Sequence, residues 1–205
     1  MSKEVLRIVN NLDVSSLEMQ LALQCAPVIS GLKISNLLSV KKEYVNKLRN
    51  LIKGTSLSMY VLLIKENKVS ILLYRKKDMM IYLKDSKVKK LLKQFGYYEN
   101  NIYMLLKKLS LRYEYYKREK GEFPHEIGLF LGYPLEDVIG FINNNGKNSL
   151  YTGYWKVYKN VDEKKALFSK YEQIKELMII LISYNLEIGE IIDMIMNIKL
   201  RRAVV

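Results

Sequence analysis

The clearest hydrophobic pattern in the chain is a pair of nearly continuous apolar runs, SMYVLLI and VSILLYR, which the polar tetrapeptide KENK separates. Short runs of β-branched, aromatic and aliphatic residues around a polar turn are typical of a β-hairpin, and we predict one over residues 58–75. Because both runs are apolar at most positions, we expect both faces of the sheet to be covered. The segment 153–160, GYWKVYKN, alternates like a strand, so we predict that it joins this sheet.

Helical periodicity predicts about eight helices around this small, mostly antiparallel sheet, so the predicted fold class is α+β. One helix covers 17–23, with Ser15 or Ser16 as its N-cap, and ends before Pro27 because proline disfavours helical geometry in the preceding residue. We expect the next segment, 28–40, to be extended or irregular. The other long helical patterns cover 5–9, 41–53, 78–83, 86–95, 99–119, 162–183 and 186–198.

The net charge of +13 is concentrated in the middle of the chain. Residues 75–120 carry fourteen basic and five acidic side chains, whereas residues 121–205 carry ten and eleven. A local basic excess favours an anionic partner: RNA, a protein–nucleic-acid complex or an acidic protein surface. The alternative is a set of solvated lysines without a partner.

No Gly/Ser/Pro linker or repeat divides the chain, so we predict a single domain over residues 1–205.

Tyrosines lie among the basic residues of the middle segment. Tyrosine rings can stack on bases while neighbouring cations hold phosphates, although no RNP or KH motif accompanies them. As the alternative, Tyr113 and Tyr116 continue an apolar helical stripe and belong to a core, with the lysines on its solvent side. The residues that we predict to bind RNA or another partner are Lys84, Lys87, Lys89, Lys90, Lys93, Lys107, Lys108, Arg112, Lys117, Arg118 and Lys120.

The single cysteine, Cys25, and the single histidine, His125, limit the chemistry. A single cysteine cannot form an internal disulfide, and one cysteine with one histidine cannot supply the usual ligand set of a structural zinc site, so we predict no metal. The absence of a glycine-rich dinucleotide motif predicts no nucleotide cofactor. No apolar run is long enough to cross a bilayer, and the N-terminal segment lacks a secretory h-region. We therefore expect a cytoplasmic protein without a membrane partner.

The acidic stretch 123–142, FPHEIGLFLGYPLEDVIGFI, supports three interpretations. With Gly132 as a turn glycine it matches a helix-turn-helix, but residues 121–146 contain four acids and no base, which opposes binding to DNA phosphates. His125 and Glu126, if the fold brings Cys25 to them, would form the site of an enzyme or of a haem-, metal- or cofactor-handling protein. The third interpretation, which we favour, is a structural corner of two helices with proline starts and Gly/Asn stops.

Four stretches resemble, in the same order, a bacterial family known as domain of unknown function 3793: CAPVISGLKISNLLSV, VSILLYR, FPHEIGLFLGYPLEDVIGFI and GYWKVYKNVDEKKALFSKYEQ. The resemblance spans roughly residues 15–180, and it assigns no reaction because the family is uncharacterised. We predict that residues 183–205 are a C-terminal helical extension outside it. The resemblance implies that these residues match motif positions of the family: Cys25, Pro27, Pro124, His125, Glu126, Gly132, Pro134, Asp137, Gly153 and Trp155.

Together these patterns predict a basic binding protein that is not an enzyme. The favoured function is binding of RNA or of a protein–nucleic-acid complex, as a regulator or inhibitor of a nucleic-acid-handling machine such as an RNA-guided nuclease. The alternative function is the enzyme or cofactor handler built from Cys25, His125 and Glu126.

Overall fold

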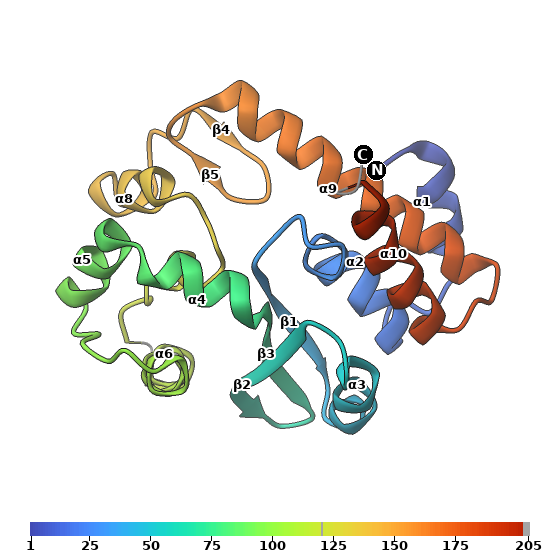
Figure 1. The fold of residues 1–205 in the computed structure, drawn as a ribbon, viewed down its shortest axis with the longest axis horizontal. Helices are drawn as coiled ribbons and strands as arrows, with labels where there is room; N and C mark the ends of the chain where they lie inside the picture. The colour runs from blue at the N-terminus through green and yellow to red at the C-terminus, as the bar shows by residue number, and fades with distance from the viewer. Residues whose placement is uncertain (120, 203–205) are drawn as a thin grey trace.

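A three-stranded antiparallel sheet lies between two groups of helices in the computed structural model, which describes residues 1–119 and 121–202, the side chains of 198–202 apart (Figure 1). The strand order is β1–β3–β2. Strands β2 (Leu57–Lys65) and β3 (Lys68–Arg75) form the predicted hairpin, and β1 (Ser35–Lys41) pairs with the other edge of β3. The predicted α+β class is confirmed.

Each face of the sheet is covered by its own hydrophobic core. Ile71 and Leu73 of β3 belong to the first core, whereas Leu72 and Tyr74 belong to the second. Successive side chains of a strand point to opposite faces, so one apolar strand supplies both cores. The nearly continuous apolar runs of the hairpin thus reflect a sheet that is buried on both faces, as we predicted.

The first core joins one face of the sheet to helices from both ends of the sequence, which gather to the right of the sheet in Figure 1. Helix α2 packs against both β1 and α9. The side chain of Ser16 accepts a hydrogen bond from Met19 N and caps α2, as predicted for one of the two serines. These helices are α1 (Lys3–Asn10), α2 (Leu17–Ile29), α3 (Tyr44–Ile52), α9 (Val161–Ser183) and α10 (Ile188–Arg202).

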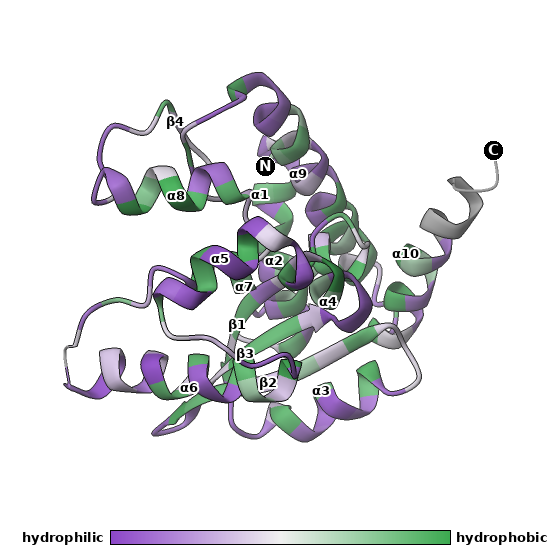
Figure 2. Cartoon of the chain, turned by 60° about the vertical axis from the view of Figure 1, so that its left-hand side comes forward, coloured by the Kyte–Doolittle hydropathy of each residue, from purple (hydrophilic) through white to green (hydrophobic). Residues whose placement is uncertain are grey.

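The second core joins the other face of the sheet to the helices at the left of Figure 1. Green apolar positions alternate with purple polar ones along α5 and α6 in Figure 2. Leu106, Leu109 and Tyr113 are buried in this core, so the predicted apolar stripe of α6 is confirmed there. These helices are α4 (Lys76–Lys84), α5 (Ser86–Gln94), α6 (Ile102–Glu119), α7 (Ile127–Phe130) and α8 (Leu135–Asn143); the described residues thus form ten helices, against about eight predicted.

The segment 153–160 does not join the central sheet, and that prediction was wrong. Within it, β5 (Lys156–Val157) pairs with β4 (Tyr151–Thr152) in a separate two-stranded hairpin. Its alternation arises because Trp155 and Val157 pack with residues of α9 in a small third cluster. The third strand of the central sheet is β1, which lies in the segment that we expected to be extended or irregular.

Helix α2 does not end at Pro27 as predicted but continues to Ile29. Proline lacks a backbone N–H and removes one helical hydrogen bond, which normally destabilises the interior of a helix. Here the surrounding residues Ala26 and Val28 are fully buried in the first core, and this burial offsets the lost bond. The predicted helix 41–53 is also shorter, because Lys41 is the last residue of β1.

Helices α9 and α10 meet at a break where Asn185 has a positive φ of 57°. Asparagine adopts this left-handed conformation more readily than most residues, and the break lies where we predicted it. The part of the chain that the structure describes contains no helix long and apolar enough to cross a membrane.

Candidate functional site

The predicted basic surface is centred on α5, whose lysines divide between two sides of the helix. Lys89 and Lys93, four residues apart, lie on the side that faces the start of α6. Lys87 and Lys90, three residues apart, lie on the side that faces α8. Lys84, at the end of α4, borders both sides. The lysines that the sequence places in one cluster therefore belong to two distinct surfaces.

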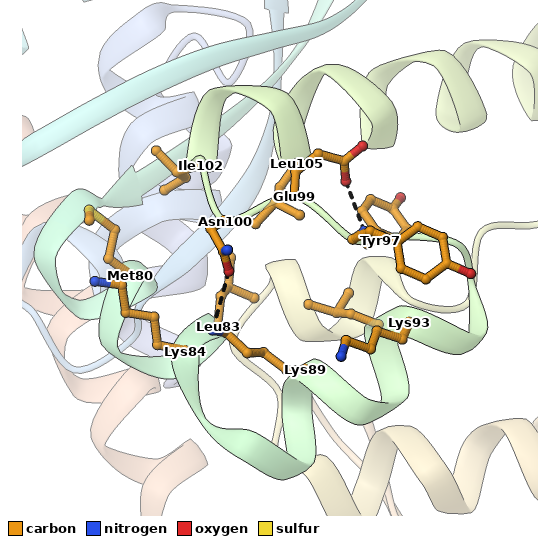
Figure 3. A pocket seen from close by; sticks show the side chains of 12 residues that line it. Met80, Leu83, Lys84, Lys89, Lys93, Tyr97, Glu99, Asn100, Ile102 and Leu105 are labelled. Carbon is orange, nitrogen blue, oxygen red and sulfur yellow. Dashed lines mark hydrogen bonds between the residues drawn. The ribbon is translucent and has the colours of Figure 1, made fainter.

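The first surface surrounds a shallow recess of about 50 Å³ between α4, α5 and the segment that leads into α6 (Figure 3). Lys84, Lys89 and Lys93 lie along one side, and Asn100 lies across from them, where its Oδ1 accepts a bond of 3.4 Å from Lys89 Nζ. Tyr98 also borders the recess and is 72% exposed. Among the described residues, none of these three lysines forms an ion pair. Three ammonium groups and an exposed ring thus border one recess.

The recess also has one acidic residue, Glu99, whose carboxylate accepts a hydrogen bond of 3.0 Å from Tyr98 N. Lys108 donates a hydrogen bond to the carbonyl of Gly96, and its ammonium lies 5.9 Å from the ring centroid of Tyr98. A cation at this distance from an aromatic ring is attracted to the ring face. Lys108 therefore connects the start of the segment that carries Tyr98 to α6, although it does not itself line the recess.

The remaining predicted cations of α6 have different surroundings. Arg112 is bound to Glu126, and Arg118 forms an ion pair of 2.7 Å with Glu114. Lys117 lies over the rings of two tyrosines of α6, whereas Lys107 is exposed. The last predicted residue, Lys120, lies outside the described residues. These arginines already serve structural contacts, which leaves the lysines near α5 as the cations best placed for a partner.

The second surface is a groove between the green α5 and the yellow α8 of Figure 1. It consists of two adjoining depressions of about 1050 and 420 Å³, which share Lys87, Leu135 and Ile139. Lys90 lines the smaller depression, and Ile81, 72% exposed, lines the larger. The groove thus combines apolar residues with lysines. Sequence reasoning missed the contribution of α8, because the acids of that stretch argued against an anionic partner.

The two acids that border this groove are engaged in structural bonds. Asp85 caps α5, because its side chain accepts hydrogen bonds from the backbone N–H groups of Lys87 and Val88. Glu136 lies 3.5 Å from the ammonium of the buried Lys164. Their negative charges are therefore partly compensated within the protein, which leaves the lysines to set the charge that the groove presents.

Cys25 lies in α2 and is fully buried in the first core. Burial raises the pKa of its thiol to about 12, so the thiol is neutral near pH 7 and is a poor nucleophile. The neighbouring Lys33 is also buried, and burial lowers the pKa of its ammonium to about 8. Cys25 therefore has the surroundings of a core residue.

Glu126 is 0% exposed and connects the acidic stretch to α6. Its carboxylate accepts a hydrogen bond from Arg112 Nε and one of 3.0 Å from the Tyr97 hydroxyl. Burial, together with the adjacent carboxylate, raises the pKa of Tyr97, and the bond to Glu126 raises the pKa of Arg112. The carboxylate is thus committed to holding two elements together.

His125 and Glu126 lie in a turn before α7, since α7 begins at Ile127 and not at Pro124 as predicted. The ring of His125 contacts Phe123 and Phe141, at centroid distances of 5.4 Å each. The three residues thus have different partners: His125 contacts two phenylalanine rings, Glu126 binds Arg112 and Tyr97, and Cys25 belongs to the first core. The described residues also contain no group of three His, Cys, Asp or Glu side chains that could hold a metal ion.

The acidic stretch folds as the predicted corner of two helices. Gly132 has a positive φ of 67°, and a Cβ on it would lie 2.9 Å from Ile34 Cβ, so the joint needs glycine for both its conformation and its packing. A Cβ on Gly128 would lie 3.0 Å from Val138 Cγ2, which shows how closely α7 and α8 approach. Pro134 is the N-cap of α8, one residue before the first turn where we expected it.

A second buried acid, Asp137, holds the β4–β5 hairpin against α8. Its Oδ2 accepts a bond of 2.8 Å from Trp155 Nε1, and its Oδ1 accepts bonds of 2.8 Å and 3.3 Å from the backbone N–H groups of Tyr158 and Lys159. Sequence reasoning did not predict this junction. The available signal was that Asp137 and Trp155 both match motif positions of the resembled family.

Comparison with known families supports the resemblance. The family model described as "Protein of unknown function (DUF3793)" matches residues 21–192. The chain therefore belongs to this family. The match includes residues 183–192, which we had expected to lie outside the family, and ends within α10. No curated protein and no solved structure was found to match the chain significantly.

Proposed function

We propose that the protein binds single-stranded RNA, free or within a protein–nucleic-acid complex, through the recess between α4, α5 and the start of α6. The observation that carries this proposal is the exposed ring of Tyr98 beside the ammonium groups of Lys89 and Lys93, which form no ion pair with any described residue. Proteins that bind single strands combine cations along the backbone with aromatic rings on which bases stack. Both kinds of side chain line this recess.

The shape of the recess supports a single strand better than a duplex. A volume of about 50 Å³ leaves no enclosed space for a ligand, so a bound chain would lie across the surface. A base would stack on the exposed ring of Tyr98, and Lys84, Lys89 and Lys93 would contact the phosphates along one side of the recess. Binding without a base-specific pocket would be weakly selective for sequence, because every base offers a face for stacking.

The same contacts would allow the protein to bind RNA that is exposed on a larger machine. A protein of this kind would act as a regulator or inhibitor by covering the RNA of a nucleic-acid-handling complex, such as an RNA-guided nuclease. Neither role requires catalysis by this chain.

The test compares two double variants of one helix with equal changes in charge. Fluorescence anisotropy would measure binding of a labelled uridine oligonucleotide to the wild type, to Lys89→Glu/Lys93→Glu and to Lys87→Glu/Lys90→Glu. We expect the first variant to weaken binding about tenfold at low salt and to flatten the salt dependence, because two phosphate contacts are lost. The second variant should change binding much less, since its lysines face the groove. Equal losses in both variants would indicate a general charge effect and would reject the recess as the site.

The contribution of stacking can be tested separately. Tyr98→Ala should weaken RNA binding about tenfold, because the stacking of one base contributes about 1–3 kcal/mol. Tyr184→Ala is a matched control, since Tyr184 is 74% exposed but lies at the end of α9. Unchanged binding in Tyr98→Ala would contradict the proposed role of the ring.

The groove between α5 and α8 supports a second candidate, an acidic protein partner. The groove combines exposed apolar residues such as Ile81 and Ile139 with Lys87 and Lys90, a combination that suits an amphipathic helix with acidic flanks. For an acidic amphipathic peptide, Lys87→Glu/Lys90→Glu should abolish binding, whereas Lys89→Glu/Lys93→Glu should preserve it. The opposite pattern, or binding that both variants retain, would reject the groove.

A further inference from the structure

A pocket of about 290 Å³ lies where the corner of α7 and α8 meets the β4–β5 hairpin. It shares no lining residue with the recess of the proposed RNA site, so the two sites can be tested independently. Residues from two segments, 123–141 and 155–156, form its walls. They are Phe123, His125, Ile127, Gly128, Leu131, Tyr133, Asp137, Val138, Phe141, Trp155 and Lys156.

Five of the eleven residues that line the pocket carry aromatic rings. Trp155 stacks on Tyr133 at a centroid distance of 4.9 Å and an angle of 26°. The ring of His125 lies between Phe123 and Phe141, with tilted or edge contacts to each. Aliphatic side chains complete the lining. Walls of this kind favour a flat, largely apolar ligand, because aromatic rings offer both apolar area and defined stacking geometry.

The polar atoms of the pocket differ in what they already bind. Asp137 accepts bonds through both of its oxygens, and Lys156 Nζ donates a bond of 2.6 Å to the carbonyl of Gly146. By contrast, Nδ1 of His125 is buried and has no hydrogen-bond partner. Among the described residues it is the only buried side-chain nitrogen or oxygen without one. Buried polar atoms are nearly always paired in folded proteins, so this nitrogen marks a position for an absent partner.

We propose that this pocket binds a small, flat, uncharged aromatic heterocycle whose ring N–H donates a hydrogen bond to His125 Nδ1. The volume lies just below the usual range of ligand pockets, which is about 300–1,000 Å³, and so limits the ligand to one or two fused rings. With its own proton on Nε2, the imidazole accepts this bond at Nδ1. The proposal assigns a function to His125 that does not involve Cys25 or Glu126.

Trp155 allows a direct test, because it lines the pocket and is the only tryptophan of the chain. Its fluorescence would be followed while benzimidazole, which has a ring N–H, or 1-methylbenzimidazole, which lacks it, is added to the full chain. We expect a saturable change with benzimidazole and about tenfold weaker binding of the methylated probe, because the latter leaves Nδ1 unpaired. A change that stays linear into the millimolar range for both probes would overturn the proposal.

Two variants distinguish the contribution of the hydrogen bond to binding from the contribution of the cavity. His125→Phe should remove the preference for benzimidazole over its methylated form, whereas Leu131→Phe, which fills the pocket, should weaken both probes. A preference that persists in His125→Phe would overturn the role of His125, and unaltered binding in Leu131→Phe would place the probes elsewhere. Added uridine oligonucleotide should not displace benzimidazole, so failure of the RNA proposal and failure of this one are distinguishable.

Discussion

The acidic corner and the basic surface around α5 use charge in opposite ways. In the corner, Glu126 and Asp137 are almost fully buried, and each carboxylate joins the corner to another element. Around α5, Lys87, Lys90 and Lys93 are exposed, and the described residues provide them with no ion pair. The first set of charges serves the fold, whereas the second set is available to a partner.

This difference shows that the net charge of a segment does not reveal its use. The sequence suggested that the acids of the corner repel nucleic acid, but buried and bonded carboxylates contribute little to the surface that a partner meets. The lysines around α5 contribute little to stability, because exposed charges are solvated. Substitutions in the corner should therefore change stability, and substitutions around α5 should change binding.

The largest expected effect follows from Asp137→Ala. This change leaves Trp155 Nε1 and two backbone N–H groups without their acceptor, which should lower the free energy of unfolding by about 4 kcal/mol. Urea denaturation followed by Trp155 fluorescence would measure the loss. Asp137→Asn, which keeps one acceptor oxygen, should lose less. A loss below that of an ordinary surface substitution would show that the hairpin does not need this junction.

Arg112→Met should have the next largest effect. It leaves the buried Glu126 without its cation. Because Arg112 is itself 39% exposed, the loss in the free energy of unfolding should be about 2 kcal/mol, below the roughly 3–5 kcal/mol of a fully buried pair. The double variant Arg112→Met/Glu126→Leu removes the buried charge as well and should recover part of the loss. If denaturation showed that the double variant is less stable than Arg112→Met, the ion pair would not be the cause.

Lys33 offers an intermediate case, because it is a lysine that the fold buries. Its pKa is lowered by burial from 10.5 to about 8, so the unfolded chain binds more protons than the native protein above about pH 8. Lys33 should therefore contribute a rise in stability of about 2 kcal/mol between about pH 7 and about pH 9.5. Burial raises the pKa of the Cys25 thiol from 9.0 to about 12, so Cys25 opposes part of this rise toward pH 9.5, and the Lys33 contribution is read from the difference between the wild type and Lys33→Met. Denaturation of both proteins at the two pH values would measure the difference. A parallel response of the two would contradict it.

The pH range has to end before the tyrosines ionise. Burial raises the pKa of Tyr133 to about 12, so above about pH 10 the unfolded chain loses protons that the native protein keeps. Stability then falls with pH, opposite to the effect of Lys33. A maximum between the two regimes would itself support both assignments.

The smallest expected effect on stability belongs to the lysines around α5. Lys87→Glu/Lys90→Glu should change the free energy of unfolding by less than about 0.5 kcal/mol per residue, as is usual for exposed positions. Lys89→Glu/Lys93→Glu should cost slightly more, about 1 kcal/mol in total, because Lys89 is half-buried and donates a hydrogen bond to Asn100. Denaturation of the variants that are used for RNA binding would test this. A loss of several kcal/mol would mean that these lysines serve the fold as the corner acids do.

Periodicity in the sequence was sufficient to predict the hairpin and the helices α4 to α6, because a buried face leaves a regular apolar repeat. It was misleading where an element packs against something other than its expected neighbour. The alternation around Trp155 is real, but it faces α9 and not the central sheet. A proline usually ends a helix. Pro27 nevertheless lies within α2, because the burial of its neighbours outweighs one missing hydrogen bond.

The candidate sites depended on tertiary structure to a greater degree. The basic segment was evident from composition, but only the orientation of α5 separates Lys89 and Lys93 from Lys87 and Lys90. The aromatic pocket was beyond sequence reasoning, since His125 and Trp155 lie thirty positions apart and meet only through the fold. The resemblance to a family identified both residues as motif positions without a physical reason for either.

Helix α9 has a consequence for how the protein is made. Its C-terminal half supplies Met178 and Ile179 to the core around α2, although more than a hundred residues separate the two helices. During synthesis, α2 leaves the ribosome early, and its apolar side chains cannot pack against α9 until nearly the whole chain has been made. The interval exposes apolar side chains to other nascent chains, so we expect the N-terminal half to depend on chaperones during translation more than the segment from α4 to α8.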